Sequence, residues 1–474
     1  MYMVGFATLV VAANALASGL STRFVEVLVA ACLVAAAVSS VIALAQGLRL
    51  DWVSFVEQLR PDGRAFANLT QPNHLASLLG LGLASVWWLF EKRWIHCAAV
   101  AALTIFLGAA LAMTQSRIAL LFLAGALFLW VVKGRRLGLR THSIGLVGFI
   151  LLVASLFAVW PGISSAIEGS AVYGVAERLQ VGGGRKVHWP AMWDAIWRQP
   201  VWGWGWLQGT AAQQAVALDH PASGEWITYS HSLVLDLLLW NGVPIGATAI
   251  SFLILWTVSR IRRCSDLDGF IALVACSVIA VHALVEFPYA YAYFLFPLAM
   301  WMGVVEARHA SAGPTLELRL PKAAVASASL VLIGMLGWLW MEYQQIEEMS
   351  QRTRFAEARY VVPAGMQPAV PDVVLIDSQR EFLRFRQMSA RPQMSPEELE
   401  VVRRVSQRFM PPAVLLRRAL AMGLNGNEAD ALYSLRLICK VWTEKNCQEG
   451  RESWASAQAL YPQISHIGFP EDGP

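Results

Sequence analysis

Long apolar runs separated by short polar segments dominate the first 341 residues of the chain. A bilayer core about 30 Å thick needs roughly 20 apolar residues per helix. About ten runs of this kind predict ten transmembrane helices, near Met3–Ser18, Phe24–Gln46, His74–Phe90, Ile95–Met113, Ile118–Val132, Ser143–Trp160, Leu233–Val258, Phe270–Leu284, Tyr289–Val305 and Ala323–Met341. Asn-Gly-Val-Pro at residues 241–244 interrupts one run and predicts a kinked single span there.

Two polar stretches break this pattern. The first is a Trp-rich insertion from Pro161 to Ser232, and the second is the tail after Met341. The sequence therefore predicts an all-α polytopic membrane protein in four parts: six transmembrane helices in residues 1–160, a large external loop in 161–232, four more helices in 233–341, and a helical soluble domain in 342–474.

The tail is predicted to form a helical stalk and a distal part, divided by Pro363, Pro368 and Pro371. Residues Ala419–Trp442 read as two amphipathic helices around a turn at residues 423–427. This pair resembles one tetratricopeptide-like repeat. Such a module binds a partner, or the chain's own loop, more often than it catalyses a reaction.

Composition agrees with a membrane protein. Hydrophobic residues make up 56% of the chain and charged residues 15%, and the mean hydropathy is +0.49. A water-soluble globule of this size is excluded. The net charge of +4 is accounted for by short basic loops, so no nucleic-acid partner is inferred.

Those basic loops set the predicted orientation, because short loops rich in Lys and Arg stay in the cytoplasm. Alternate loops carry Arg23; Lys92 and Arg93; Lys133, Arg135, Arg136 and Arg140; Arg260, Arg262 and Arg263; and Arg308, Arg319 and Lys322. The exceptions are Arg49, Arg60 and Arg64. The large loop and the tail are then external. Met1 also falls outside, which indicates either a missing N-terminal portion with further helices or a misassigned start.

Six cysteines leave one pairing open. Cys32, Cys97, Cys264 and Cys276 fall in membrane or cytoplasmic positions, whereas Cys439 and Cys447 lie in the external tail. A disulfide is permitted there, and two free thiols are the alternative.

Polar residues gather at the predicted outer ends of several spans. In one external loop Pro72 disfavours helix at Gln71, and Asn73 is expected to cap the helix that begins beside His74. These three side chains form a polar cluster at the outer membrane surface, and a cap with an incidental histidine is the alternative. Arg117 begins a helix at the outer surface, where it either holds an anion or snorkels to the interface.

The central loop offers further candidates. Gly182–Gly184 give a flexible approach to Arg185 and Lys186, two cations suited to a diphosphate unless they are simply a solvated basic surface. Trp189, Trp193 and Trp197 recur every four residues on one helical face. This face and the later Trp202, Trp204 and Trp206 either anchor the chain in the membrane interface or stack on sugar rings.

His231 closes this loop at the start of a span. Imidazole accepts a proton near neutral pH, so His231 is the candidate general base, and a structural histidine is the alternative. Asp236 is poorly spaced to orient it. His282 and Glu286 lie four apart at the outer end of another span, where they can pair on one helix face, for structure or for catalysis.

These stretches together resemble the bacterial O-oligosaccharyltransferases that glycosylate pilins and other exported proteins, a branch of the O-antigen ligase and polymerase superfamily. The carrying motifs are QPNHLA at residues 71–76, TQSR at 114–117, GRKVHWPAMWDAIWRQPVWGWGW at 184–206, SHS at 230–232 and HALVEFPYAYAYFLFP at 282–297. They occur in the family's order and with its spacing.

The resemblance implies a metal-independent and cofactor-free transfer on the periplasmic face of the inner membrane. The donor is a polyprenyl-diphosphate-linked glycan and the acceptor a Ser or Thr hydroxyl of a pilin-like protein. In this reading His231 activates the hydroxyl, and Arg117 and Arg185 neutralise the leaving diphosphate. Gln71, Asn73, His74 and Lys186, together with Trp189, His282 and Glu286, complete the site.

Two departures from the family pattern stand out. Members often read His-Ser-His-Asn where this chain has Tyr229-Ser230-His231-Ser232, and they usually begin with additional helices. An O-antigen ligase acting on the lipid A core, or an O-antigen polymerase, would share the same site. A transporter or flippase is a more distant alternative, because the charges lie at the outer ends of spans and not at the bilayer midplane.

Overall fold

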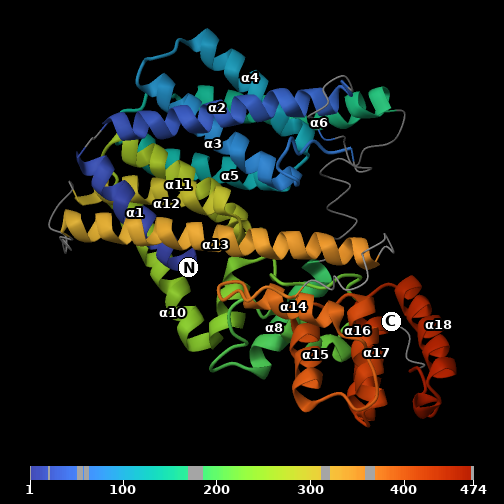
Figure 1. The fold of residues 1–474 in the computed structure, drawn as a ribbon. Coiled ribbons are helices and arrows are strands. Elements are labelled where there is room, and N and C mark those ends of the chain that lie inside the picture. Colours follow the sequence, from blue (N-terminus) through green and yellow to red (C-terminus); the bar gives the residue numbers. More distant parts are fainter. Residues whose placement is uncertain are drawn as a thin grey trace. The chain divides into compact units, whose positions relative to one another are not determined.

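The computed structural model describes residues 2–19, 22–50, 57, 63–168, 185–310, 321–357 and 369–470, and within these ranges the chain is helical with no strand (Figure 1). The helices of the first part of the chain are α1 Tyr2–Gly19, α2 Thr22–Gly47, α3 Pro72–Glu91, α4 Cys97–Thr114, α5 Arg117–Leu129 with a π-helical turn Trp130–Gly134, α6 Ser143–Glu168, α8 Arg185–Arg198 and α9 Gly209–Val216. Then follow α10 Leu233–Arg263, α11 Leu267–Val285, α12 Ala292–Ala310, α13 Lys322–Glu357, α14 Asp377–Gln387, α15 Pro396–Arg408, α16 Pro412–Leu424, α17 Glu428–Val441 and α18 Glu444–Leu460.

The predicted all-α polytopic membrane architecture is confirmed. Eight helices of the described ranges are long and apolar enough to cross a membrane. The two remaining predicted spans coincide with α1, whose apolar part is shorter, and with α12, which begins three residues later than expected.

Two helices extend past the ends of the predicted spans. Helix α6 continues through Pro161 to Glu168, and α13 continues sixteen residues past Met341 to Glu357. The predictions for Gly182–Gly184, Arg60, Arg319, Pro363 and Pro368 lie outside the described residues.

The chain divides into two compact units. Unit 1 comprises Met1–Gly183, His231–Leu233 and Ile250–Val325. Unit 2 comprises Gly184–Ser230, Val234–Ala249 and Ala326–Pro474. Each is described by itself.

Small residues let the helices of unit 1 approach closely. A Cβ on Gly303 of α12 would lie 2.5 Å from the Cβ of Ala13 on α1, and one on Gly82 of α3 would lie 2.4 Å from the Cβ of Ala36 on α2. Contacts this short exclude any larger residue. Small residues at such crossings are typical of membrane helices, where van der Waals packing replaces the hydrophobic effect between helices.

The predicted kink in α10 is confirmed and has a specific partner. Gly242 has φ +74° and ψ 170°, and Pro244 lacks the N–H that the carbonyl of Trp240 would otherwise accept. The loop after α8 supplies the missing bonds: the N–H groups of Trp204 and Gly205 donate to the carbonyls of Leu239 and Trp240 at 2.8 and 3.0 Å. Gly203 of the Trp-Gly-Trp-Gly-Trp turn thus allows a close backbone approach, because a Cβ there would lie 2.4 Å from the nitrogen of Gly242.

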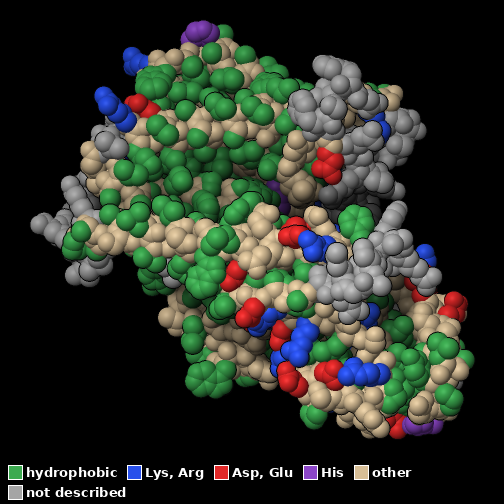
Figure 2. Space-filling model, in the orientation of Figure 1, with side chains coloured by type: hydrophobic (Ala, Val, Ile, Leu, Met, Phe, Trp, Pro, Cys, Tyr) green, Lys and Arg blue, Asp and Glu red, His purple; other side chains and the backbone are tan. Residues whose placement is uncertain are grey.

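In unit 2 the central loop and the tail share one hydrophobic core. Ala217 and Trp226 of the loop pack with residues of α15 to α17. The Gly224 N–H donates to the carbonyl of Val441 at 2.8 Å, and the Tyr433 hydroxyl donates to the carbonyl of Gln214 at 2.8 Å. The tail therefore binds the chain's own loop, one of the two partners expected for such a module. Its exposed surface is rich in charged side chains (Figure 2).

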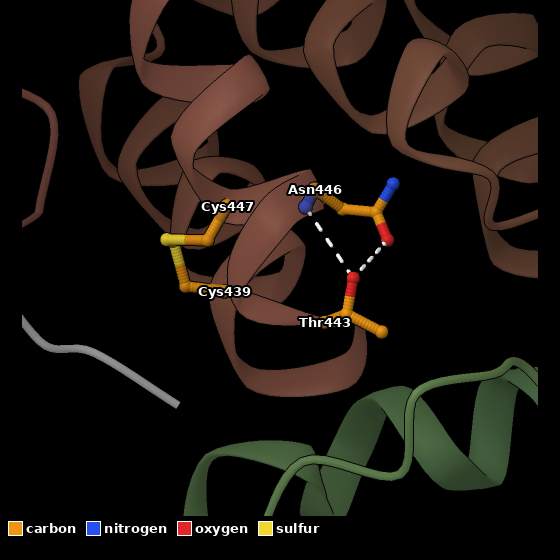
Figure 3. The surroundings of a disulfide bond; sticks show 4 residues. All are labelled: Cys439, Thr443, Asn446 and Cys447. Atoms are coloured by element: carbon orange, nitrogen blue, oxygen red, sulfur yellow. Dashed lines mark hydrogen bonds between the residues drawn. A yellow bond between two sulfur atoms is a disulfide. The ribbon is translucent and has the colours of Figure 1, made fainter.

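The helix pair predicted for Ala419–Trp442 is present as α16 and α17, joined by a turn in which Gly426 has φ +80°. Cys439 of α17 is bridged to Cys447 of α18, which answers the open question of their pairing (Figure 3). Between them Thr443 caps α18 by accepting from the N–H of Asn446. A structural disulfide is typical of an oxidising compartment.

Candidate active site

His231 lies beside a carboxylate in unit 1. Its Nδ1 is 2.8 Å from Oε2 of Glu286, and its ring meets Phe287 edge-on at 4.7 Å. The residue has φ +58°, in the left-handed region that non-glycine residues rarely adopt. Such a backbone at the junction of a loop and α10 costs free energy, and it turns the ring toward the end of α11.

Glu286 is positioned by the end of α11. It is the C-cap residue, with extended backbone (φ −153°, ψ −171°), and only 6% of it is exposed. The predicted four-residue spacing to His282 assumed a continuous helix, which ends at Val285. The Glu286 carboxylate reaches two other segments: it accepts from Asn73 Nδ2 at 3.1 Å and pairs with His231.

The expectation that Asn73 caps α3 was wrong. Gln71 is the N-cap, without a side-chain cap bond, and Pro72 occupies the first helical position, which suits a residue without an N–H. Asn73 is thereby left to bridge helices. Its Oδ1 accepts from the Ser116 hydroxyl at 2.7 Å and from Arg64 Nη2 at 3.4 Å, while its Nδ2 donates to Glu286.

These contacts form one chain of hydrogen bonds, here called the histidine cluster: Ser116, Asn73, Glu286 and His231. Its members come from the N-terminus of α5, the first turn of α3, the end of α11 and the start of α10. Asn73 fixes one oxygen of the carboxylate, and the second oxygen faces the imidazole. Because a carboxylate only accepts, the Nδ1 of His231 carries the proton and Nε2 is the acceptor of the ring.

His74 is walled in beside this cluster. It is 2% exposed, its Nδ1 lies 2.8 Å from the Tyr293 hydroxyl, and its ring packs edge-on against Tyr291 at 4.6 Å. His282, fully buried, lies 2.8 Å through Nδ1 from the Ser77 hydroxyl. Burial to this degree favours a positioning part for both histidines. Tyr291 and Tyr293 thus form part of the wall around His74.

Arg117 is the first residue of α5, directly after Ser116, and is half-buried. Within the described ranges its guanidinium has no hydrogen bond or ion pair. An unpaired cation is costly unless solvent or an anion reaches it. Arg117, whose guanidinium has no partner among the described residues, therefore follows directly in the chain after Ser116 of the histidine cluster.

The loop candidates belong to unit 2. Arg185 is half-buried and Lys186 exposed on the first turn of α8. On the next turn the Trp189 indole N–H donates to the carbonyl of Ser230, the residue before His231, at 2.9 Å. Asp236 accepts from the N–H of Ser230 at 2.8 Å, so it orders the backbone before His231.

The other tryptophans of the α8 face are exposed. Trp193 and Trp197 are 49% and 55% exposed and meet edge-on at 5.8 Å, and Trp202 is 81% exposed. Exposed indoles suit either of the two expected roles, anchoring in the membrane interface or stacking on a sugar ring.

A second polar cluster lies at the opposite end of the same helices. Asp268, at the start of α11, accepts from the Trp88 indole at 2.8 Å and pairs with Arg308 at 2.8 Å and Lys92 at 3.3 Å. Lys133 donates to the carbonyls of Arg262 and Cys264. The spans thus run from the histidine cluster to an end that gathers the predicted cytoplasmic cations. Asp266 and Asp268 lie at this end.

Sequence reasoning missed Ser116, Ser77 and Arg64. Ser116 stands inside the quoted TQSR motif at a helix N-cap position, which is a signal for a structural hydroxyl. In the structure its hydroxyl serves Asn73 and makes no cap bond. Nothing local in the sequence marked Ser77 as the partner of a histidine 205 residues away.

Three family models match successive parts of the chain. The model described as "Protein glycosylation ligase" matches residues 65–90, "O-Antigen ligase" matches 102–250, and "Virulence factor membrane-bound polymerase, C-terminal" matches 271–463. All four members of the histidine cluster fall within these ranges. No solved structure matches the chain.

Two curated proteins of Acinetobacter baylyi are similar. The "General O-oligosaccharyltransferase" is 28% identical over 82% of this chain and 69% of its own length. The "ComP-specific O-oligosaccharyltransferase" is 33% identical over 57% of this chain, which spans about half (49%) of that relative. Together with the family models, these similarities support a place for the chain in the bacterial O-oligosaccharyltransferase family, within the O-antigen ligase superfamily.

Proposed function

We propose that this protein transfers an oligosaccharide from a polyprenyl-diphosphate carrier to a Ser or Thr hydroxyl of an exported, pilin-like protein. The reaction takes place on the periplasmic face of the bacterial inner membrane. The observation that carries the proposal is the His231–Glu286 pair, held by Asn73 and Ser116 beside Arg117.

His231 is the general base in this proposal. Glu286 holds the proton on Nδ1, so Nε2 accepts the proton of the attacking hydroxyl as its oxygen bonds to the anomeric carbon. The bond between that carbon and the diphosphate oxygen breaks in the same displacement, and its electron pair leaves with the diphosphate. The carboxylate then stabilises the imidazolium that forms.

Arg117 stabilises the leaving group. A diphosphate leaves as a stable anion and needs little acid help, but its developing charge requires a donor fixed in advance. The Arg117 guanidinium, unpaired in the described chain, matches phosphate oxygens with a planar fork. The prediction that Arg185, Lys186, Gln71 and His74 also bind the donor stays a prediction from sequence.

The periplasmic orientation is supported by two features. The histidine cluster lies at the helix ends opposite Lys92, Lys133 and Arg308, and the positive-inside rule places those cations in the cytoplasm. Independently, the Cys439–Cys447 disulfide of the tail fits an oxidising compartment.

The second candidate is an O-antigen ligase or polymerase, which the descriptions of two matched family models favour. These activities differ from protein glycosylation in the acceptor alone. The similarity to two named O-oligosaccharyltransferases supports a protein acceptor.

The test is co-expression with a lipid-linked glycan pathway and a candidate pilin, with the mass of the pilin as readout. We expect a shift equal to the glycan, and a fall of about 10²- to 10⁴-fold in initial rate for His231→Ala. A shift that appears only on lipopolysaccharide would select the ligase. Wild-type transfer rates in His231→Ala would refute the mechanism.

The same assay tests the separate prediction for the loop. Arg185→Ala is expected to abolish transfer while the protein still inserts and accumulates. Val201→Ala, an exposed change in the same loop, is the matched control. Full activity of Arg185→Ala would remove this residue from the site.

A further inference from the structure

Unit 2 contains a cavity of about 560 Å³ that none of the residues discussed for transfer lines. This volume lies in the usual range for small-molecule sites, roughly 300–1,000 Å³. Its walls come from the Trp-Gly-Trp-Gly-Trp turn, from α9 and from the tail helices α15 to α17. Its aromatic, amide and cationic side chains include Trp204, Trp206, Gln208, Gln407, Arg418 and Tyr433.

Two indole rings form one side of the cavity. The Trp204 N–H donates to the carbonyl of Ala195 at 2.8 Å, and the Trp206 N–H donates to Asn241 Oδ1 at 3.0 Å. Both indole donors are therefore used inside the protein. What the rings offer to a ligand is apolar face, and Trp206 remains 48% exposed.

Amide side chains line the same space. Within the described ranges, the side chains of Gln208 and Gln407 make no hydrogen bond, and the Gln214 Nε2 is held by the carbonyl of Ser406. A glutamine amide offers two donors and an acceptor. The lining contains no acidic side chain.

Arg418 supplies the cation of the cavity and is only 5% exposed. Its Nη2 donates to Asp430 at 2.6 Å and its guanidinium lies 5.6 Å from the centre of the Tyr433 ring. Burial raises the pKa of Asp430, but the hydrogen bonds and charges of Arg403 and Arg418 outweigh it and hold that pKa below its ordinary value. In the part of the chain that the structure describes, Nε and Nη1 of Arg418 have no acceptor. Buried donors are seldom left unsatisfied, so the site is short of acceptor oxygens.

We propose that this cavity binds a carbohydrate: the sugar unit lies against the indole faces while its hydroxyl oxygens meet Arg418 and the glutamine amides. Hydroxyl groups both donate and accept, which suits unpaired amides and a donor-only guanidinium together. An extended peptide is bound typically along the edge of a sheet, and the described ranges contain no strand. The proposal rests on the proposed function only for the choice of sugar.

The sugar has two sources in a glycosyltransferase, the lipid-linked donor and the glycosylated product. The probe is the free oligosaccharide released from the donor used in the transfer assay, titrated into the purified full chain in detergent and followed by saturation-transfer NMR. Product protein with and without its glycan forms the second arm. Glycan-dependent binding of the product alone would assign the cavity to product, and binding of the free sugar assigns it to the oligosaccharide itself.

Two variants avoid the buried Arg418. Trp206→Ala and Gln407→Ala are each expected to weaken sugar binding about tenfold, equivalent to about 1.4 kcal/mol. Trp202→Ala is the matched control, because Trp202 is 81% exposed in the same turn and does not line the cavity. His231→Ala is expected to retain sugar binding although it loses transfer, so failure of the catalytic proposal and failure of this one are separate results.

Three outcomes of the sugar titration would overturn the proposal. The first is that the wild-type chain binds no sugar in either arm. The second is that Trp206→Ala and Gln407→Ala bind the sugar as well as Trp202→Ala does. The third is that binding is lost only in His231→Ala. If unglycosylated acceptor protein binds and only that binding responds to Trp206→Ala, the cavity is a peptide site and the carbohydrate assignment is wrong.

Discussion

The same helices of unit 1 build a polar cluster at each end, and the two clusters differ in what is left unpaired. At one end the buried Asp268 carboxylate accepts a hydrogen bond from Trp88 and forms ion pairs with Lys92 and Arg308. At the other end Glu286 meets an imidazole and an amide, and the nearby Arg117 has no partner in the described ranges.

We interpret the Asp268 cluster as structural and the histidine cluster as catalytic. Asp268 joins α3, α11 and α12 through its contacts with Trp88, Lys92 and Arg308. Glu286 instead contacts the Asn73 amide and the His231 imidazole, and an imidazole is a side chain that can take up and release a proton in a reaction. The tests below change one end while the other serves as its control.

Glu286→Gln is expected to have the largest effect. An amide at this position no longer fixes the proton on Nδ1 of His231, so the transfer rate falls about 10²- to 10⁴-fold. The measurement is the initial rate of pilin glycosylation per folded molecule. Glu306→Gln, the same chemical change at the opposite end where Glu306 pairs with Arg260, is the matched control and keeps its rate. Equal losses in both variants would mean that Glu286 is structural.

Asp268→Asn is expected to lower the stability of the protein and to leave its transfer rate unchanged. Losing the charge leaves Arg308 and Lys92 without their buried partner, at a cost of about 2–3 kcal/mol, because both cations keep some access to water. We expect a lower midpoint in thermal unfolding followed by size-exclusion chromatography in detergent. The transfer rate of the molecules that remain folded should not change. A loss of rate without a loss of stability would link this end to the reaction.

Arg117→Lys is the mildest change and tests the shape of the cation. Lysine keeps the charge and loses the planar fork, so the rate is expected to fall about tenfold, against about 10²-fold for Arg117→Ala. Neither variant should affect the unfolding midpoint, because Arg117 has no partner in the described chain. A stabilising effect of the arginine would instead show that it snorkels to the interface, the alternative reading of its position.

The disulfide offers a test of the tail. The double variant Cys439→Ser, Cys447→Ser removes a disulfide that joins residues eight positions apart. By loop entropy, such a bridge stabilises the folded state by roughly 2–3 kcal/mol. The expected result is earlier proteolysis of α17 and α18. Unchanged protease resistance, with or without reductant, would show that the bridge contributes nothing to the tail.

The sequence by itself determined the spans, the kink in α10, the tail helix pair and the types of residue at the outer ends. Each of these depends on local periodicity or on Gly and Pro, whose backbone preferences do not need a partner. His231, Glu286, Asn73 and Arg117 were named from their side-chain chemistry, their positions at the predicted ends of spans and the family resemblance.

Only the tertiary structure decided which side chains and backbone groups contact one another. Helical spacing assigned Glu286 to His282, but α11 ends one residue earlier and the carboxylate reaches His231, 55 residues away in the chain, and Asn73, 213 residues away. The contact of the Trp-Gly-Trp-Gly-Trp turn with the α10 kink, the loop-and-tail core and the cavity around Arg418 are of the same kind. Such contacts depend on backbone groups and side chains far apart in sequence, and no periodicity within one segment encodes its partner.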